Sequence, residues 1–167
     1  NDDKSMPGMD MSKPEMQSDD NSKQQLTVVY RDYIIMKDAF VASDLQKVSD
    51  AAAKVKLSLK AVDMTLLKGD DHIKWMKYSG DLEKNLEKII SGKDLIIQRE
   101  SFATFNTVFH DAVKTYGLSG ITTFYQYCPM ANDNKGAFWL SEKNEIANPY
   151  FGEKMMKCGK TKEVLNY

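Results

Sequence analysis

Apolar side chains recur, mostly at steps of three and four residues, along four successive stretches of this sequence. Because an α-helix has 3.6 residues per turn, this spacing gathers them on one face of a helix. Four amphipathic helices joined by short loops predict an antiparallel four-helix bundle. The four stripes are Leu26, Val29, Tyr33, Met36 and Phe40; Leu45, Val48, Ala52, Val55, Leu59, Val62 and Leu66; Ile73, Met76, Leu82, Leu86 and Ile89; and Phe102, Phe105, Phe109, Ala112 and Tyr116.

Polar and glycine-containing segments mark the ends of the expected helices. Ser43 and Gln46 have the spacing of a capping box, which predicts a tight turn between the first two helices. Residues 68–71 and 91–94 each combine a helix stop with a new N-cap. Gly117 is expected to close the fourth helix.

The pattern changes after the fourth helix. Residues 122–127 and 137–140 are short runs of β-branched, aromatic and apolar side chains, and residues 131–136 between them have a strong turn composition. We expect a small C-terminal β-hairpin or irregular segment packed on the bundle. The chain is therefore expected to be mainly α, with a Met-rich leader at residues 1–22 and one domain at residues 23–167.

Charge and composition argue against several classes of protein. The 167 residues include 23 basic and 24 acidic side chains, a balance that argues against nucleic-acid binding. No apolar run approaches the roughly 20 residues that span a bilayer. The sequence has no nucleophile elbow, no P-loop and no Glu-x-x-His pair, and its two histidines lie on different expected helices. We therefore expect a protein that is not an enzyme.

Cysteine and methionine are concentrated in two segments near the C-terminus. Thiolate and thioether sulfurs are soft, polarisable donors that favour Cu(I) over hard ions. A nitrogen ligand can be added by His110, which lies on the fourth expected helix; the alternative is a histidine hydrogen-bonded at the edge of the bundle. The candidate metal ligands are Cys128, Met130, Met155, Met156, Cys158 and His110.

The two cysteines also allow a structural interpretation. A pair of cysteines in an exported protein often forms a disulfide. A bond from Cys128 to Cys158 would close a loop of about 30 residues and contribute roughly 3–4 kcal/mol to stability. The residues by themselves leave metal ligation and a disulfide as alternatives.

The leader, residues 1–22, is rich in Asp, Ser, Met, Pro and Lys and lacks apolar periodicity, which is typical of a flexible tether. Methionines in such a segment gain nothing from burial, so their clustering indicates a second, weaker and mobile site for Cu(I). A chance cluster in a linker of biased composition is the alternative. These methionines are Met6, Met9, Met11 and Met16.

Several motifs resemble an uncharacterised bacterial domain that occurs alone in exported proteins and fused to the periplasmic adaptor subunits of copper and silver efflux pumps. The resemblance covers most of the chain from about Gln25 to Glu163. In the Cys-Pro-Met motif, Ala131 occupies the position where similar heavy-metal-binding modules carry a histidine. The motifs are AFVASD at 39–44, AAA at 51–53, YCPMA at 127–131, GAFWLS at 136–141, NPYFG at 148–152 and MMKCG at 155–159.

This resemblance implies a metal-handling protein that is periplasmic or otherwise exported, either free or lipid-anchored, with an efflux-pump adaptor or another exported protein as a partner. A membrane attachment is expected only through a removed N-terminal anchor. The chain starts at Asn1 rather than at methionine, which we interpret as a processed product. We expect an exported copper-binding protein accessory to heavy-metal efflux or homeostasis. The alternative is a non-catalytic interaction module held by a Cys128–Cys158 disulfide.

Overall fold

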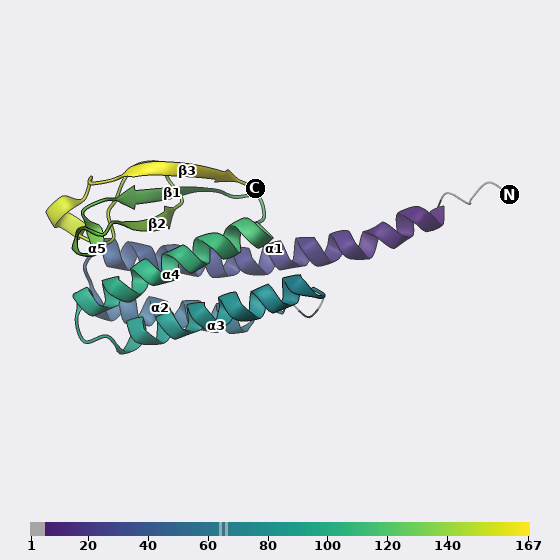
Figure 1. Ribbon diagram of the computed structural model, residues 1–167, viewed down its shortest axis with the longest axis horizontal. Helices are drawn as coiled ribbons and strands as arrows, with labels where there is room; N and C mark the ends of the chain where they lie inside the picture. Colours follow the sequence, from purple (N-terminus) through teal and green to yellow (C-terminus); the bar gives the residue numbers. More distant parts are fainter. Residues whose placement is uncertain (1–5, 64, 66) are drawn as a thin grey trace.

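Four long helices and a small sheet make up the protein in a computed structural model that describes residues 6–63, 65 and 67–167, without the side chains of residues 6–19. The expected mainly α bundle with a small C-terminal β segment is confirmed (Figure 1). Each helix packs against the next one along the chain. The helices are α1 (Met6–Val41), α2 (Leu45–Lys60), α3 (Asp70–Ser91) and α4 (Leu95–Tyr116).

The first helix, α1, starts at Met6, earlier than the domain boundary expected at residue 23. None of the helices in the described part of the chain combines the length and the apolar character needed to cross a bilayer.

Side-chain caps begin two of the helices. Asp94 caps α4 as expected, its carboxylate accepting a hydrogen bond from the Ile97 amide at 2.9 Å. The predicted capping box at Ser43 is wrong, because Asp44 caps α2 instead and accepts from the Lys47 amide at 3.0 Å. Ser43 has a left-handed φ of 55°, and its hydroxyl accepts a hydrogen bond from Arg99.

Two details of the expected apolar stripes are corrected by the structure. The second helix ends at Lys60 rather than near residue 66, and beyond it the Asp63 carboxylate accepts a hydrogen bond from the Thr65 amide. Leu66, the last residue of the predicted stripe, lies outside the described residues. In α3 the predicted core residues Ile73 and Met76 are 66% and 58% exposed. The intervening Trp75 is buried instead and packs edge-on against Tyr116.

Three antiparallel strands in the order β2-β1-β3 form the sheet. The expected hairpin is present as β1 (Thr122–Cys128) and β2 (Ala137–Ser141), joined by the short helix α5 (Ala131–Asn134). The connection needs Gly136, because its φ is +84° and a Cβ there would overlap the Tyr127 hydroxyl. A third strand, β3 (Lys160–Asn166), pairs with β1 and was not predicted, since only Leu165 among its residues is buried.

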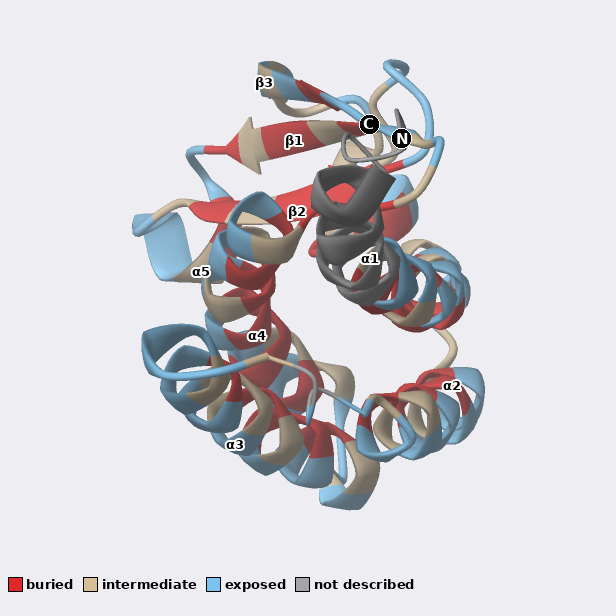
Figure 2. Cartoon of the chain, turned by 90° about the vertical axis from the view of Figure 1, so that its right-hand side faces the viewer, coloured by how far each residue is buried: buried red, intermediate tan, exposed pale blue. Residues whose placement is uncertain are grey.

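The sheet lies over α1 and α4 and covers one side of the bundle (Figure 2). Tyr125 of β1 stacks on His110 of α4, with ring centroids 3.6 Å apart. On the α1 side, the Leu140 amide of β2 donates to the Tyr33 hydroxyl at 2.9 Å. The sheet and the helices therefore share one core, in which Phe40, Phe102, Phe105, Phe109 and Trp139 are among the largest buried side chains.

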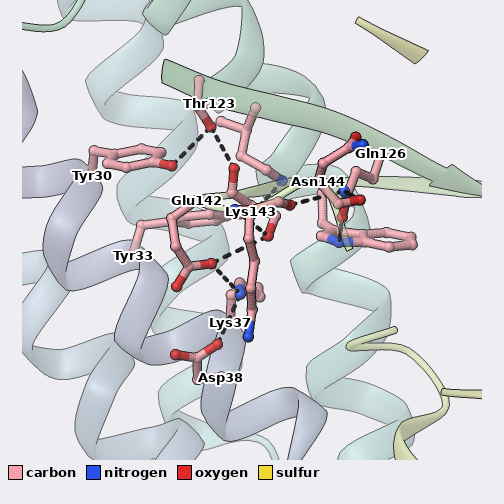
Figure 3. A network of polar contacts seen from close by, with 12 residues as sticks. Tyr30, Tyr33, Lys37, Asp38, Thr123, Gln126, Glu142, Lys143 and Asn144 are labelled. Atoms are coloured by element: carbon pink, nitrogen blue, oxygen red, sulfur yellow. Dashed lines mark hydrogen bonds and ion pairs between the residues drawn. The ribbon is translucent and has the colours of Figure 1, made fainter. Parts of the chain in front are cut away.

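A polar network joins α1 to the ends of β1 and β2 (Figure 3). The Tyr30 hydroxyl donates to Thr123 at 2.8 Å. Two turns further along α1, the ammonium of Lys37, which is only 1% exposed, pairs with Glu142 at 3.0 Å and with Asp38 at 2.8 Å. Partial burial alone would raise the pKa of the Glu142 carboxyl, but the Lys37 ammonium lowers it. This ion pair attaches the end of β2 to the first helix.

Asn106 connects three parts of the fold through its buried side chain. Its carbonyl oxygen accepts from the Tyr33 hydroxyl of α1. Its amide nitrogen donates to the Phe102 carbonyl at 2.9 Å and to the Tyr150 hydroxyl at 3.0 Å. The Tyr150 hydroxyl in turn donates to the Phe138 carbonyl of β2 at 2.6 Å. Asn106 thus holds α1, α4 and the segment after β2 together.

Replacing Asn106 by alanine is expected to lower the free energy of unfolding by about 3 kcal/mol, because a cavity forms and the buried Tyr33 donor loses its acceptor. Urea denaturation followed by circular dichroism measures this loss. The neighbouring exposed Thr107, changed to alanine, is the matched control and should shift stability by no more than about 0.5 kcal/mol. Equal stability of the two variants would contradict the role given to Asn106.

Candidate metal centre

The two cysteines of the chain lie in contact at one end of the sheet. Cys128 is the last residue of β1, and Cys158 precedes β3 by two positions. Because β1 and β3 pair antiparallel, with Tyr127 opposite Lys160, the end of one strand meets the start of the other. Their Sγ atoms are 2.8 Å apart, and both cysteines are free thiols. Cys128 is fully buried, whereas Cys158 is half-buried.

The backbone around Cys158 is held by hydrogen bonds to a buried asparagine. The Asn148 side-chain amide donates to the Cys158 carbonyl at 2.9 Å, and the Asn148 backbone amide donates to the Met156 carbonyl at 2.9 Å. Gly159 follows with a φ of +133°, and a Cβ there would lie 2.8 Å from the Tyr127 carbonyl. Glycine is therefore required for the close approach that brings Cys158 to the end of β1.

Contact between the thiols favours the protonated form of Cys158. The hydrogen bond with the Cys128 thiol, together with desolvation, raises the pKa of Cys158 to about 11. The Cys158 sulfur is therefore a protonated thiol at neutral pH. Since a metal binds the thiolate, occupation of this site must release the proton.

Two of the candidate methionines line one cleft, and each lies two or three residues from a cysteine in the chain. Met130 follows Cys128 by two residues and is 47% exposed. Met155 ends the short helix η2 (Gly152–Met155), and its carbonyl accepts from the Cys158 amide at 3.1 Å. Both line a cleft of about 1070 Å³ between the α1–α2 turn, the start of α4, α5 and η2. Met156 is half-buried and is not part of the cleft lining.

His110 lies in a different cluster, at the edge of the bundle. Its Nε2 is 2.9 Å from a carboxylate oxygen of Glu163 in β3, and its ring stacks on Tyr125. Lys114 also binds Glu163, at 3.0 Å. Lys114 and His110 both lower the pKa of the Glu163 carboxyl, and the effect of Lys114 is the larger. Neither cysteine is among the contacts of His110. This arrangement matches the alternative of a hydrogen-bonded histidine at the bundle edge.

The candidate leader site lies outside the described side chains, which exclude those of Met6, Met9, Met11 and Met16. The structure does describe where the leader joins the helical bundle. Lys23 of α1 lies beside Gly117, and the Thr27 hydroxyl accepts from the Ser119 amide at 2.8 Å, at the end of the bundle where α4 stops. The cleft with Met130 is at the other end of α1, where Ala42 and Ser43 line it.

The donor set at the cysteines suits a soft ion. Among the described residues, no group of three or more His, Cys, Asp or Glu side chains is arranged to hold a metal. Two thiols with nearby thioethers are the alternative donor set, and these are ligands that Cu(I) prefers. The sequence did not reveal Asn148 as a support of this site, because Asn148-Pro149 has the composition of an ordinary turn.

The protein is of the class of four-helix bundles that carry a small antiparallel sheet. Its two cysteines are in contact at the end of that sheet. The model of a family described as "Protein of unknown function (DUF3347)" matches residues 29–120, more than half of the chain, and the chain belongs to this family. The matched region includes the C-terminal part of α1 (residues 29–41) together with α2, α3 and α4, and it ends before β1. No curated protein and no solved structure matches the chain.

Proposed function

We propose that this is an exported soft-metal-binding protein that holds Cu(I) between Cys128 and Cys158 and acts as an accessory to heavy-metal efflux or homeostasis. The observation that carries the proposal is the 2.8 Å contact of two free thiols, which come from segments 30 residues apart. An efflux-pump adaptor subunit is the proposed partner, in line with the resemblance of the Cys-Pro-Met segment and its neighbours. The proposed function involves neither nucleic acid nor catalysis.

A metal between the two sulfurs requires them to separate. With metal–sulfur bonds of about 2.3 Å, as in zinc thiolates, two sulfurs on one ion lie roughly 4 Å or more apart. The two sulfurs are 2.8 Å apart in the structure. Cys128 is fully buried in β1, so the half-buried side chain of Cys158 is the one that moves in this proposal, while Asn148 holds its backbone. The required shift of about 1 Å is within the reach of a side-chain rotation.

The leader methionines form a second, weaker site in this proposal. Residues 1–22 join the bundle beside Gly117, at the end opposite the cleft with Met130. We therefore propose that the leader binds its own Cu(I) rather than completing the cysteine site of the same molecule. Such a site raises the amount of metal held near the protein.

Titration of the reduced protein with Cu(I), against a competing chromophoric chelator, tests this assignment. The expected result is one tightly bound Cu(I) per protein, retained when residues 1–22 are removed. Failure of both proteins to compete with the chelator would refute the proposal. Loss of tight binding only on truncation would move the site from Cys128 and Cys158 to the leader.

The same sulfur contact favours a second candidate function, a structural interaction module held by a Cys128–Cys158 disulfide. The bond would close a loop of about 30 residues and contribute roughly 3–4 kcal/mol. Counting reactive thiols in denatured protein purified without reductant separates the two functions. Two thiols per chain are expected for the metal-binding protein and none for the disulfide-linked module.

A further inference from the structure

Hydrogen bonds of one arginine join the walls of the cleft that Met130 and Met155 line. Arg99 of α4 donates from Nε to the Pro149 carbonyl at 2.8 Å and from Nη2 to the Phe40 carbonyl at 2.8 Å. It also donates to the Ser43 hydroxyl at 3.0 Å. One guanidinium thus links α4, the α1–α2 turn and the segment before η2. The cleft is a preformed feature of the fold rather than a gap between mobile parts.

Each cysteine has a methionine from its own segment in the wall of this cleft. Pro129 alone separates Cys128 from Met130. On the other side, the hydrogen bond from the Cys158 amide to the Met155 carbonyl closes a turn of the chain. Met130 is nearly half-exposed, so core packing does not account for it. The cleft therefore presents two soft donors to solvent, next to a pair that is largely buried.

We infer that Met130 and Met155 are transfer ligands, which take Cu(I) from a donor in the cleft and pass it to Cys128 and Cys158. This inference rests on the proposed function and adds the route of the metal. At each step one copper–sulfur bond forms and one bond to the previous ligand breaks, while copper remains Cu(I). The thiol protons leave to solvent when the thiolates bind. In this role the methionines control the rate of loading and contribute little to the final affinity.

Protonation explains why thioethers would act first. A thioether carries no proton at any pH and can bind an arriving ion at once. A thiol, by contrast, must lose its proton before it binds as the thiolate. A ligand that holds the ion during this deprotonation shortens the path from donor to thiolate.

The test is the transfer of Cu(I) from a coloured chelator complex to the reduced protein, measured by stopped flow where the rate is proportional to protein concentration. The double variant Met130→Leu, Met155→Leu is expected to load at least about tenfold more slowly than the unchanged protein, with its equilibrium affinity within about threefold. Leucine conserves the volume of methionine, so the fold should be retained.

Met76→Leu is the matched control, because Met76 is an exposed methionine of α3 that does not line the cleft. It is expected to load at the rate of the unchanged protein. Equal rates for all three proteins would overturn the inference and leave the proposed function intact. A matching fall of rate and affinity in the double variant would also overturn it, since the methionines would then be equilibrium ligands. If the unchanged protein takes no Cu(I) from the chelator, the proposed function itself fails.

Discussion

Replacing Cys128 by serine is expected to lower the affinity for Cu(I) by more than about a hundredfold. Loss of an outer-shell partner of a metal ligand costs 10–100-fold, so loss of a ligand itself should cost more. Serine keeps the approximate size of cysteine but offers an oxygen that Cu(I) disfavours. Competition with a chromophoric chelator measures the affinity, and circular dichroism checks that the helices are retained.

A second variant separates lost binding from lost folding. Cys128 is fully buried, so a serine hydroxyl there loses its hydration and can destabilise the sheet. Cys158 is half-buried, and serine at that position reaches solvent more easily. If both cysteines bind the ion, Cys158→Ser should weaken Cu(I) binding to a similar degree. Unchanged affinity in either folded variant would remove that cysteine from the site.

The affinity for Cu(I) is expected to rise steeply with pH. Because the pKa of the Cys158 thiol is about 11, this group is protonated throughout the range from pH 6 to pH 8. Binding must therefore release its proton, and each pH unit favours the complex by a factor of about ten. Over these two units the affinity should increase by about a hundredfold.

Titrations at several pH values, corrected for the protonation of the chelator, measure this slope. The Cys158→Ser variant is the control, since its dependence on pH should be weaker by about one proton. An affinity that does not change between pH 6 and pH 8 would contradict binding through thiolates. It would instead favour ligation by thioethers, which do not titrate.

The bundle could be predicted because burial of a helix is decided by a local repeat. Val48, Ala52, Val55 and Leu59 recur every three or four residues, and all of them are buried on one face of α2. The cap at Asp94 has an equally local signal. Ile73 and Met76 show where this reasoning fails, since the bulkier Trp75 takes the buried position in α3.

The sequence of the third strand, β3, has no local pattern that predicts a strand. Residues 160–166 form the edge of the sheet, where charged side chains face solvent and only Leu165 is buried. Pairing with β1 therefore decides that this segment is a strand. The same pairing explains why His110 meets Glu163 of β3 rather than a cysteine.

The amino-acid sequence by itself determined the four helices, the hairpin and the kinds of donor atom near the C-terminus, because each depends on neighbours within a few positions. Only the tertiary structure decided that Cys128 meets Cys158, and that Met130 and Met155 share a cleft. Both contacts depend on the register of β1 against β3 and on the hydrogen bonds of Asn148 and Arg99. These interactions join residues far apart in the chain, so a local pattern in the sequence does not indicate which residues will meet.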